Sequence, residues 1–204
     1  MAFQSIMADN VLIPTSIFSM PVKPKVLKRQ HVARSRLFQV EELELRFANG
    51  VERTYERLAS SGFGAVAVVP VTPEGSVILV QEYGAGINDY QWGVPKGAID
   101  PGEINLEAAN RELREEVGFA ARGLQYLKTI HINPSYMARS IDVIYAEDLY
   151  ESPLEGDEPE PLLKMEWPLG RLSELLIRGD VADGISIAAL FLVRDYLAAK
   201  HSCG

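Results

Sequence analysis

Cysteine is almost absent from this sequence of 204 residues, in which Cys203 is the single one. One cysteine excludes a disulfide framework and a zinc site built from thiolates, and it fits a reducing, cytoplasmic location. Basic residues are also scarce, since 20 Lys and Arg oppose 28 Asp and Glu and the net charge is −8. Nucleic-acid surfaces neutralise phosphates with clustered Lys and Arg. We therefore expect no nucleic-acid partner, whereas a small anionic substrate is compatible with a few local cations or a metal.

Long hydrophobic runs are missing as well. A membrane-spanning helix needs about 20 consecutive apolar residues, and no segment approaches that length, so no membrane partner is expected. The partly apolar stretch 11–22 is interrupted by Pro14 and Pro21, and no basic segment precedes it, unlike a secretory signal. We expect residues 1–24 to form a disordered extension, with Met20 as an alternative start of translation.

The hydrophobic content of 47% is enough to bury the core of one α/β domain with an appendage. The appendage is a predicted β-hairpin. Apolar and polar residues alternate over 43–47, Asn49 and Gly50 tolerate positive φ, and extended-type residues resume over 51–58. We expect residues 25–60 to form an N-terminal β region and residues 61–200 to form the main domain.

Within the main domain, apolar segments bounded by turn residues predict strands at 65–69, 77–81, 91–95, 124–132 and 141–145. An acidic loop with several prolines follows at 150–162. The chain ends with two predicted helices, at 169–177 and 185–199. Such a mixture of strands and helices predicts a sheet covered by helices.

The clearest helix lies between Asn105, a predicted N-cap, and Gly118, a predicted terminator. Its apolar positions recur at intervals of three and four, and residues 112, 115 and 116 fan over another side as glutamates. Such crowded carboxylates repel one another, and hard oxygen ligands of this kind suit Mg²⁺ or Mn²⁺. The alternative is a solvated acidic face, which is the commoner role of a charge run.

The surrounding pattern decides between these two interpretations. Residues 97–118 follow the order Gly-x5-Glu-x7-Arg-Glu-Leu-x-Glu-Glu-x-Gly, with Glu103 and Arg111 able to bracket the loop against the helix. This pattern resembles the Nudix box at every fixed position. The resemblance implies an α/β fold of the Nudix type, an α/β/α sandwich with a mixed sheet, preceded here by the N-terminal β-hairpin region. Accidental similarity on a structural helix is the alternative.

The resemblance also implies roles for the box residues. Glu112 and Glu116 are expected to be the principal Mg²⁺ ligands, Glu115 to complete the cluster, and the carbonyl of Lys96 to add a backbone oxygen, with Mn²⁺ as an alternative metal. Arg111 and Glu115 are included among the expected catalytic residues. The metal would neutralise phosphate charge and activate water for hydrolysis of a pyrophosphate.

Related enzymes take a general base from a mobile loop after the box. In this chain the loop offers Glu158, which we favour, and Glu160, with Glu155 and Asp157 nearby. Glu160 could instead bind a metal, and all four could be solubilising surface charges.

Segments 32–38, 154–162 and 189–194 resemble Nudix hydrolases that cleave ADP-ribose, diadenosine triphosphate and NADH. A proline and a tyrosine after the box, here Pro134 and Tyr136, are associated with ADP-ribose and diadenosine polyphosphate substrates respectively. NADH pyrophosphatases with a zinc ribbon need four cysteines, and this sequence has one. NADH is therefore expected to be a secondary substrate. Arg53 and Arg57 are candidates for phosphate or ribose contact, although each could be a surface strand residue.

Relatives use a lead-in like residues 25–60 to pair across a two-fold axis, so a homodimer is expected. Two alternatives stay open from the sequence. One is a Nudix enzyme that hydrolyses oxidised nucleoside triphosphates, and the other is a non-catalytic module that binds nucleotide.

Overall fold

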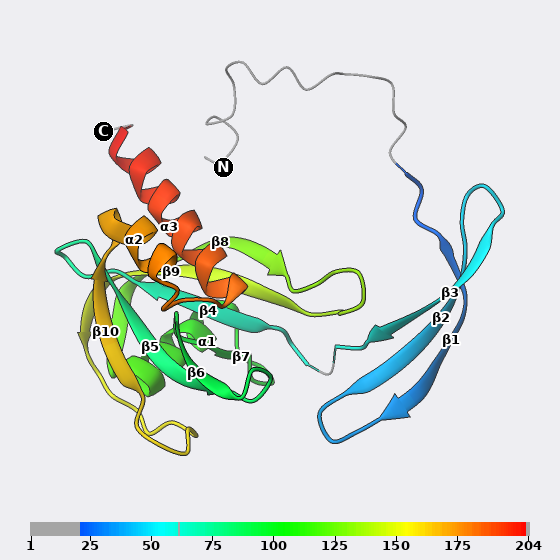
Figure 1. Cartoon of the computed structure of the whole chain (residues 1–204), viewed down its shortest axis with the longest axis horizontal. Coiled ribbons are helices and arrows are strands. Elements are labelled where there is room, and N and C mark those ends of the chain that lie inside the picture. The colour runs from blue at the N-terminus through cyan, green and yellow to red at the C-terminus, as the bar shows by residue number, and fades with distance from the viewer. Residues whose placement is uncertain (1–20, 61, 203–204) are drawn as a thin grey trace.

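The computed structural model describes residues 21–60 and 62–202. An N-terminal antiparallel sheet has the order β1-β2-β3, built from β1 (Lys25–Arg34), β2 (Gln39–Arg46) and β3 (Glu52–Leu58). Gly50, at φ 84°, lies in the turn between β2 and β3, where its N–H donates to the Phe47 carbonyl. This sheet projects from the rest of the molecule (Figure 1). The predicted hairpin is therefore confirmed as β2 and β3, and β1 adds a third strand that the sequence did not indicate.

The main body contains two sheets. The first has the order β7-β4-β9-β8, with β4 (Ala65–Pro70) parallel to β9 (Ser140–Glu151) and antiparallel to β7 (Lys96–Ala98), while β8 (Phe119–His131) pairs antiparallel with β9. The second is antiparallel, with the order β10-β5-β6. It comprises β10 (Leu163–Pro168), β5 (Ser76–Gly84) and β6 (Asp89–Gly93).

Side chains alternate along β4 between two apolar cores. Val66 and Val68 pack with Ala109 and Leu113 on one side, whereas Val69 packs with residues of the C-terminal helices on the other. Strand side chains point to opposite faces in turn, so a strand buried on both faces must be apolar throughout. This arrangement confirms the predicted α/β/α sandwich with a mixed sheet.

Helix α1 (Asn105–Glu112) ends with the box residue Glu112 and continues into a π-helical turn, η1 (Leu113–Val117). Gly118 ends the helix at φ 85°, as predicted. The predicted capping role of Asn105 is wrong. Ile104 is the N-cap, and the Asn105 side chain instead donates to Asp142 on β9. The Asn105 side chain therefore bonds to a distant strand instead of to the backbone at the start of its own helix.

The C-terminal part contains a 3₁₀ turn, η2 (Leu169–Arg171), followed by α2 (Leu172–Arg178) and α3 (Gly184–Ser202). Both helices were predicted, whereas β10 was not. Strand β9 extends to Glu151, so the acidic loop begins later than predicted. No helix among residues 21–60 and 62–202 is long and apolar enough to cross a membrane. The predictions for residues 1–20 and for Cys203 lie outside the described residues.

Candidate active site

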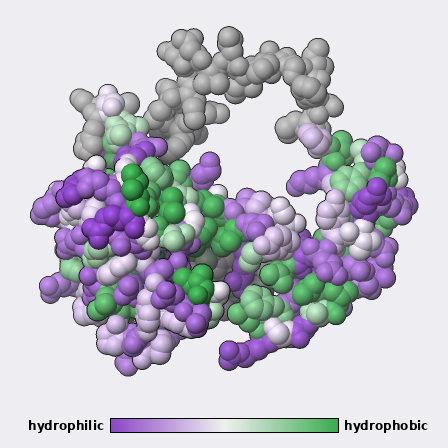
Figure 2. All heavy atoms as spheres, viewed as in Figure 1, coloured by the Kyte–Doolittle hydropathy of each residue, from purple (hydrophilic) through white to green (hydrophobic). Residues whose placement is uncertain are grey.

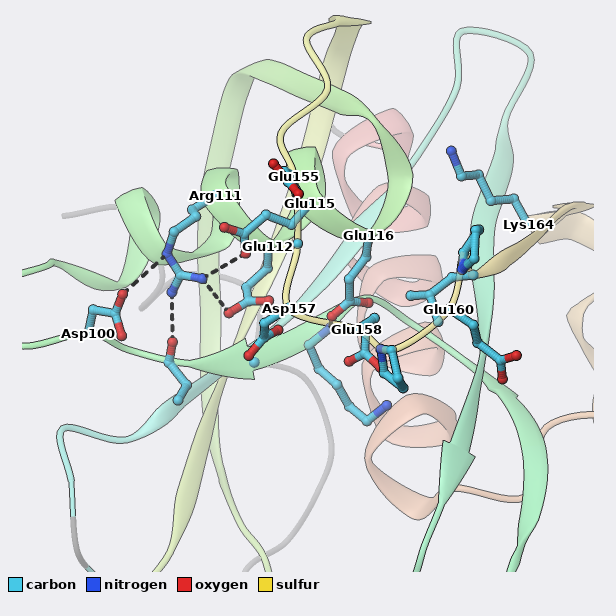
Figure 3. Close-up of a pocket in the computed structure, with 17 residues that line it drawn as sticks. Asp100, Arg111, Glu112, Glu115, Glu116, Glu155, Asp157, Glu158, Glu160 and Lys164 are labelled. Atoms are coloured by element: carbon cyan, nitrogen blue, oxygen red, sulfur yellow. Dashed lines mark hydrogen bonds and ion pairs between the residues drawn. The ribbon is translucent and has the colours of Figure 1, made fainter.

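A cavity of about 820 Å³ lies between strand β7, the loop that precedes β10 and the helix formed by α1 and η1, which we call the glutamate helix (Figure 3). Four acidic residues on the helix side line it: Asp100, Glu112, Glu115 and Glu116. Four more come from the loop: Glu155, Asp157, Glu158 and Glu160. The basic lining residues are Lys96, Arg111 and Lys164. Such an excess of carboxylates leaves the cavity short of positive charge.

Glu116 is one of two buried carboxylates in this cavity, the other being Glu112. Its Oε1 accepts the Lys96 backbone N–H at 3.3 Å, and its Oε2 is buried without a hydrogen-bond partner. Burial raises the pKa of Glu116 to about 8, although the nearby Lys96 ammonium opposes that shift. An orphaned carboxylate oxygen inside a protein is costly, so a ligand with positive charge would stabilise it.

Arg111 connects the helix to the loop before it. Its guanidinium donates to Glu103 through Nε and Nη2, both at 3.0 Å, and to the Ala98 carbonyl at 2.8 Å. The predicted bracket between Glu103 and Arg111 is therefore confirmed. Arg111 Nη1 also donates to Glu112 Oε1 at 2.7 Å and to Glu115 Oε2 at 3.0 Å (Figure 3). The hydrogen bonds that Arg111 donates to Glu103 lower the pKa of the Glu103 carboxyl.

Within the described part of the chain, no three acidic, histidine or cysteine side chains converge as the ligands of one metal ion would. Two of the box carboxylates, Glu112 and Glu115, are instead paired with Arg111. The residues nevertheless fit a hard divalent cation. They supply oxygen donors in excess, and one of these, Glu116 Oε2, has no other partner.

Gly97 gives the Glu112 carboxylate its place. A Cβ built on Gly97 would overlap the Glu112 carboxylate, so any side chain there would displace it. The glycine of the box is thus explained by close approach rather than by backbone conformation, since its φ is not in the left-handed region.

The Lys96 side chain is a feature that the sequence did not reveal, because only its carbonyl was predicted to take part. Lys96 Nζ lies 2.6 Å from Glu82 Oε2 on β5, and both side chains are largely buried. The ammonium is also near Glu116, and these carboxylates raise the pKa of Lys96 against the effect of burial. No local signal links positions 82 and 96, which lie on strands of two different sheets.

The acidic loop is attached to the glutamate helix at both ends. Arg114 Nε donates to the Ser152 carbonyl at 3.0 Å, and the Leu154 N–H donates to the Arg114 carbonyl at 3.1 Å. At the other end, Lys164 Nζ donates to the Val117 carbonyl at 2.7 Å. The loop is therefore placed over the box glutamates by contacts to η1.

The two candidate bases differ in their surroundings. Burial, with Glu82 and Asp157 nearby, raises the pKa of Glu158, which favours proton acceptance closer to neutral pH. Glu160 accepts a hydrogen bond from the Tyr90 hydroxyl and points away from the box glutamates (Figure 3). Both line the cavity, but Glu158 has no hydrogen-bond partner among the described residues.

The predicted substrate-binding residues lie outside this cavity. Arg57 on β3 pairs with Glu41 at 2.8 Å, and Arg53 donates to the Glu52 carbonyl. Tyr136 lies in the β8–β9 connection, where Asn133 donates to its hydroxyl. None of the three is a lining residue, so their role stays a prediction.

Comparison with known proteins agrees with this geometry. Residues 24–57 match the NudE-type Nudix hydrolase N-terminal domain, and residues 63–180 match the NUDIX domain. The chain is 48% identical over 178 residues to the ADP compounds hydrolase NudE of Escherichia coli (strain K12), covering 87% of this chain and 95% of that protein. It is 30% identical over 187 residues to an ADP-ribose pyrophosphatase of Bacillus subtilis (strain 168), covering 87% and 97%.

Solved structures agree as well. A crystal structure of an ADP compounds hydrolase superposes with a TM-score of 0.82 at 45% identity, covering 90% of this chain and 98% of that one. Sequence, fold and carboxylate arrangement lead to one assignment: the chain belongs to the Nudix hydrolases and carries a NudE-type N-terminal domain.

Proposed function

We propose that this protein hydrolyses the pyrophosphate bond of ADP-linked compounds such as ADP-ribose and diadenosine triphosphate, with NADH as a further substrate, and releases AMP. The observation that supports this proposal most directly is Glu116 Oε2, a buried oxygen among the box carboxylates that has no hydrogen-bond partner. Similarity to an ADP compounds hydrolase and to an ADP-ribose pyrophosphatase over most of their lengths supports the substrate class.

Nudix hydrolases generally need a divalent metal, and we propose Mg²⁺, with Mn²⁺ able to replace it. Glu112, Glu115, Glu116 and the Lys96 carbonyl would hold it. Bound there, the metal supplies positive charge that neutralises the pyrophosphate oxygens and acidifies water. Arg111 would remain bonded to Glu103 while Glu112 and Glu115 turn toward the cation, because the bracket does not depend on those two carboxylates.

We assign Glu158 as the general base. It accepts the proton of the attacking water, whose oxygen forms a bond to phosphorus as the bridging P–O bond breaks. Its raised pKa and lack of a competing partner support this assignment over Glu160, whose carboxylate is occupied by Tyr90. Loss of a general base costs about 10²- to 10⁴-fold in rate, so Glu158→Gln should lower kcat by that order.

We also propose a homodimer formed through the N-terminal sheet. Apolar side chains gather on that sheet (Figure 2), and β1 is exposed along nearly its whole length. An exposed apolar patch on a small isolated sheet usually marks an interface. In such a dimer, the N-terminal sheet of one copy would have to reach the cavity of the other copy for Arg53 and Arg57 to contact the substrate. A cytoplasmic location stays a prediction that rests on the single cysteine.

The decisive experiment incubates purified protein and Mg²⁺ with ADP-ribose, diadenosine triphosphate, NADH and 8-oxo-dGTP, and identifies the products by chromatography. We expect AMP from the ADP-linked compounds and loss of turnover in Glu116→Gln. Preference for 8-oxo-dGTP would favour an enzyme that hydrolyses oxidised nucleoside triphosphates. No turnover of any substrate would favour a non-catalytic binding module.

A further inference from the structure

One side chain of the acidic loop is hydrogen-bonded to the second sheet. Between its two attached ends, residues 155–162 receive a single hydrogen bond from the rest of the described chain, from the Tyr90 hydroxyl to Glu160. Tyr90 lies on β6 and lines, together with the loop, a second cavity that the box glutamates do not line. The middle of the loop is therefore supported by a contact that the Nudix box does not include.

The Tyr90 ring is held in place by residues of β5 and β6 that do not belong to the loop. Tyr83 on β5 is directly across the strand pair from Tyr90, and the two rings meet edge to face with centroids 5.5 Å apart. The Tyr83 hydroxyl donates to Asn88 Oδ1 at 2.7 Å, in the turn that joins the strands. Both tyrosines are about half exposed, at 47% and 49%, so neither is needed to fill the core.

The chain between Glu160 and Glu158 is stiff enough to transmit a restraint. Pro159 separates the two glutamates and Pro161 follows the second. Proline fixes its own φ, and it restricts the preceding residue to extended backbone. Both glutamates precede a proline, so fixing Glu160 also limits where Glu158 can lie.

We propose that Tyr90 is a positioning residue, which binds Glu160 and thereby fixes the catalytic base Glu158 over the box glutamates. Glu160 then serves as an anchor of the loop rather than as a base or a metal ligand. The proximity of Glu160 raises the pKa of the Tyr90 hydroxyl, consistent with a proton that stays on Tyr90 in this contact. The proposal rests on the proposed role of Glu158.

The test is a double-mutant cycle with Tyr90→Phe, which removes only the hydroxyl, and Glu160→Leu, which removes only the acceptor. Misplacing a catalytic group by about 1 Å can cost up to about 100-fold in rate, so we expect each single change to lower kcat about tenfold and to leave KM within about twofold. The double variant should be no slower than either single one, because both changes break the same bond. Additive losses would overturn the proposal.

Glu160→Gln separates anchoring from direct chemistry. An amide oxygen can accept the Tyr90 hydrogen bond, but it can neither act as a base nor replace a carboxylate ligand. We expect Glu160→Gln to retain most of the activity that Glu160→Leu loses. Equal losses in the two variants would show that Glu160 acts directly and would refute the anchor.

NMR relaxation gives a readout that does not depend on turnover. The backbone order parameter of the non-proline residues of 155–162 should fall in Tyr90→Phe and in Glu160→Leu. It should not change in the control Tyr126→Phe, which removes another exposed hydroxyl, bonded to Thr129 on β8. An unchanged order parameter in Tyr90→Phe would overturn the proposal. Full activity of Glu158→Gln, by contrast, would refute the base assignment alone.

Discussion

At the scale of single residues, Glu116 is a buried acid whose ionisation works against folding. Its pKa is about 8 in the folded protein, against a reference of 4.5. A carboxyl with a raised pKa binds its proton more tightly when folded, so stability is greatest below the unfolded value and is lost as pH rises from 4.5 toward 8. A metal at the site would remove this penalty.

We therefore expect the metal-free protein to lose about 2–4 kcal/mol of stability between pH 5 and pH 8 through Glu116. In Glu116→Gln this part of the loss should vanish, since the amide cannot ionise, and activity should vanish with it. Denaturant unfolding at several pH values measures the difference. The control is Glu166→Gln, an exposed glutamate on β10. Parallel pH curves for wild type and Glu116→Gln would contradict the buried-acid interpretation.

Gly97 is the second residue on which the site depends, because its missing side chain makes room for Glu112. We expect Gly97→Ala to push that carboxylate aside and to lower kcat by about 100-fold, the cost of misplacing a catalytic group by about 1 Å. Steady-state kinetics measures this. Gly86→Ala is the matched control, because a Cβ there meets nothing within 4 Å. Equal activity of both variants would contradict the close-approach argument.

At the scale of elements, the acidic loop depends on η1 for its position. Arg114→Leu removes the hydrogen bond to the Ser152 carbonyl and leaves the start of the loop attached only by backbone hydrogen bonds. A hydrogen bond from a charged group contributes about 1.5–3 kcal/mol, so we expect a loss of that order in unfolding free energy together with a fall in kcat.

The control for Arg114 is Arg122→Leu, which breaks an exposed ion pair with Asp148. Exposed pairs contribute about 0–1 kcal/mol, so this variant should unfold and turn over much as the wild type does. If Arg114→Leu behaved like Arg122→Leu in both measurements, the attachment of the loop to η1 would not matter for its position.

The elements that could be predicted are those specified by nearby residues. The box was predictable because its glycines, glutamates and arginine act within 22 consecutive positions, 97 to 118. Strand β10 was missed because its partner is β5, some 80 residues earlier, where Leu163 pairs with Gln81. Strand β1 was missed because it is exposed on both faces and so lacks the apolar alternation of a half-buried strand.

The residues of the site divide in the same way, into those specified by nearby residues and those that depend on distant ones. Glu112, Glu115, Glu116 and the Arg111 bracket were predicted from the resemblance to the Nudix box, whereas the Lys96–Glu82 pair and the Tyr90–Glu160 contact join separate strands or loops. The capping role of Asn105 failed for a related reason, because Asp142 on a distant strand accepts its side-chain N–H. Residue type alone could not show which partner a polar group would take.

At the scale of the whole molecule, the N-terminal sheet touches the main body mainly through its last strand. The Leu58 N–H donates to the Tyr136 carbonyl, and the Ala138 N–H donates to the Leu58 carbonyl. Much of the sheet therefore remains uncovered within one chain. Three strands without a packed face have little stability of their own in water, which is the reason for proposing that a second copy covers the sheet.

We expect wild-type protein to sediment as a dimer at micromolar concentration, and the double variant Leu37→Asp, Phe38→Asp to sediment as a monomer. Leu37 and Phe38 are 58% and 46% exposed in the single chain, so charges there should not unfold the monomer, but they would be costly to bury in an interface. Ile177→Asp on α2 is the control, because that side chain is 86% exposed on the main body. A monomeric wild type, or a double variant that remains dimeric, would show that this surface does not hold two copies together. A monomer with lowered turnover would further indicate that the second copy contributes to the site, which is how we propose that Arg53 and Arg57 on β3 would reach it.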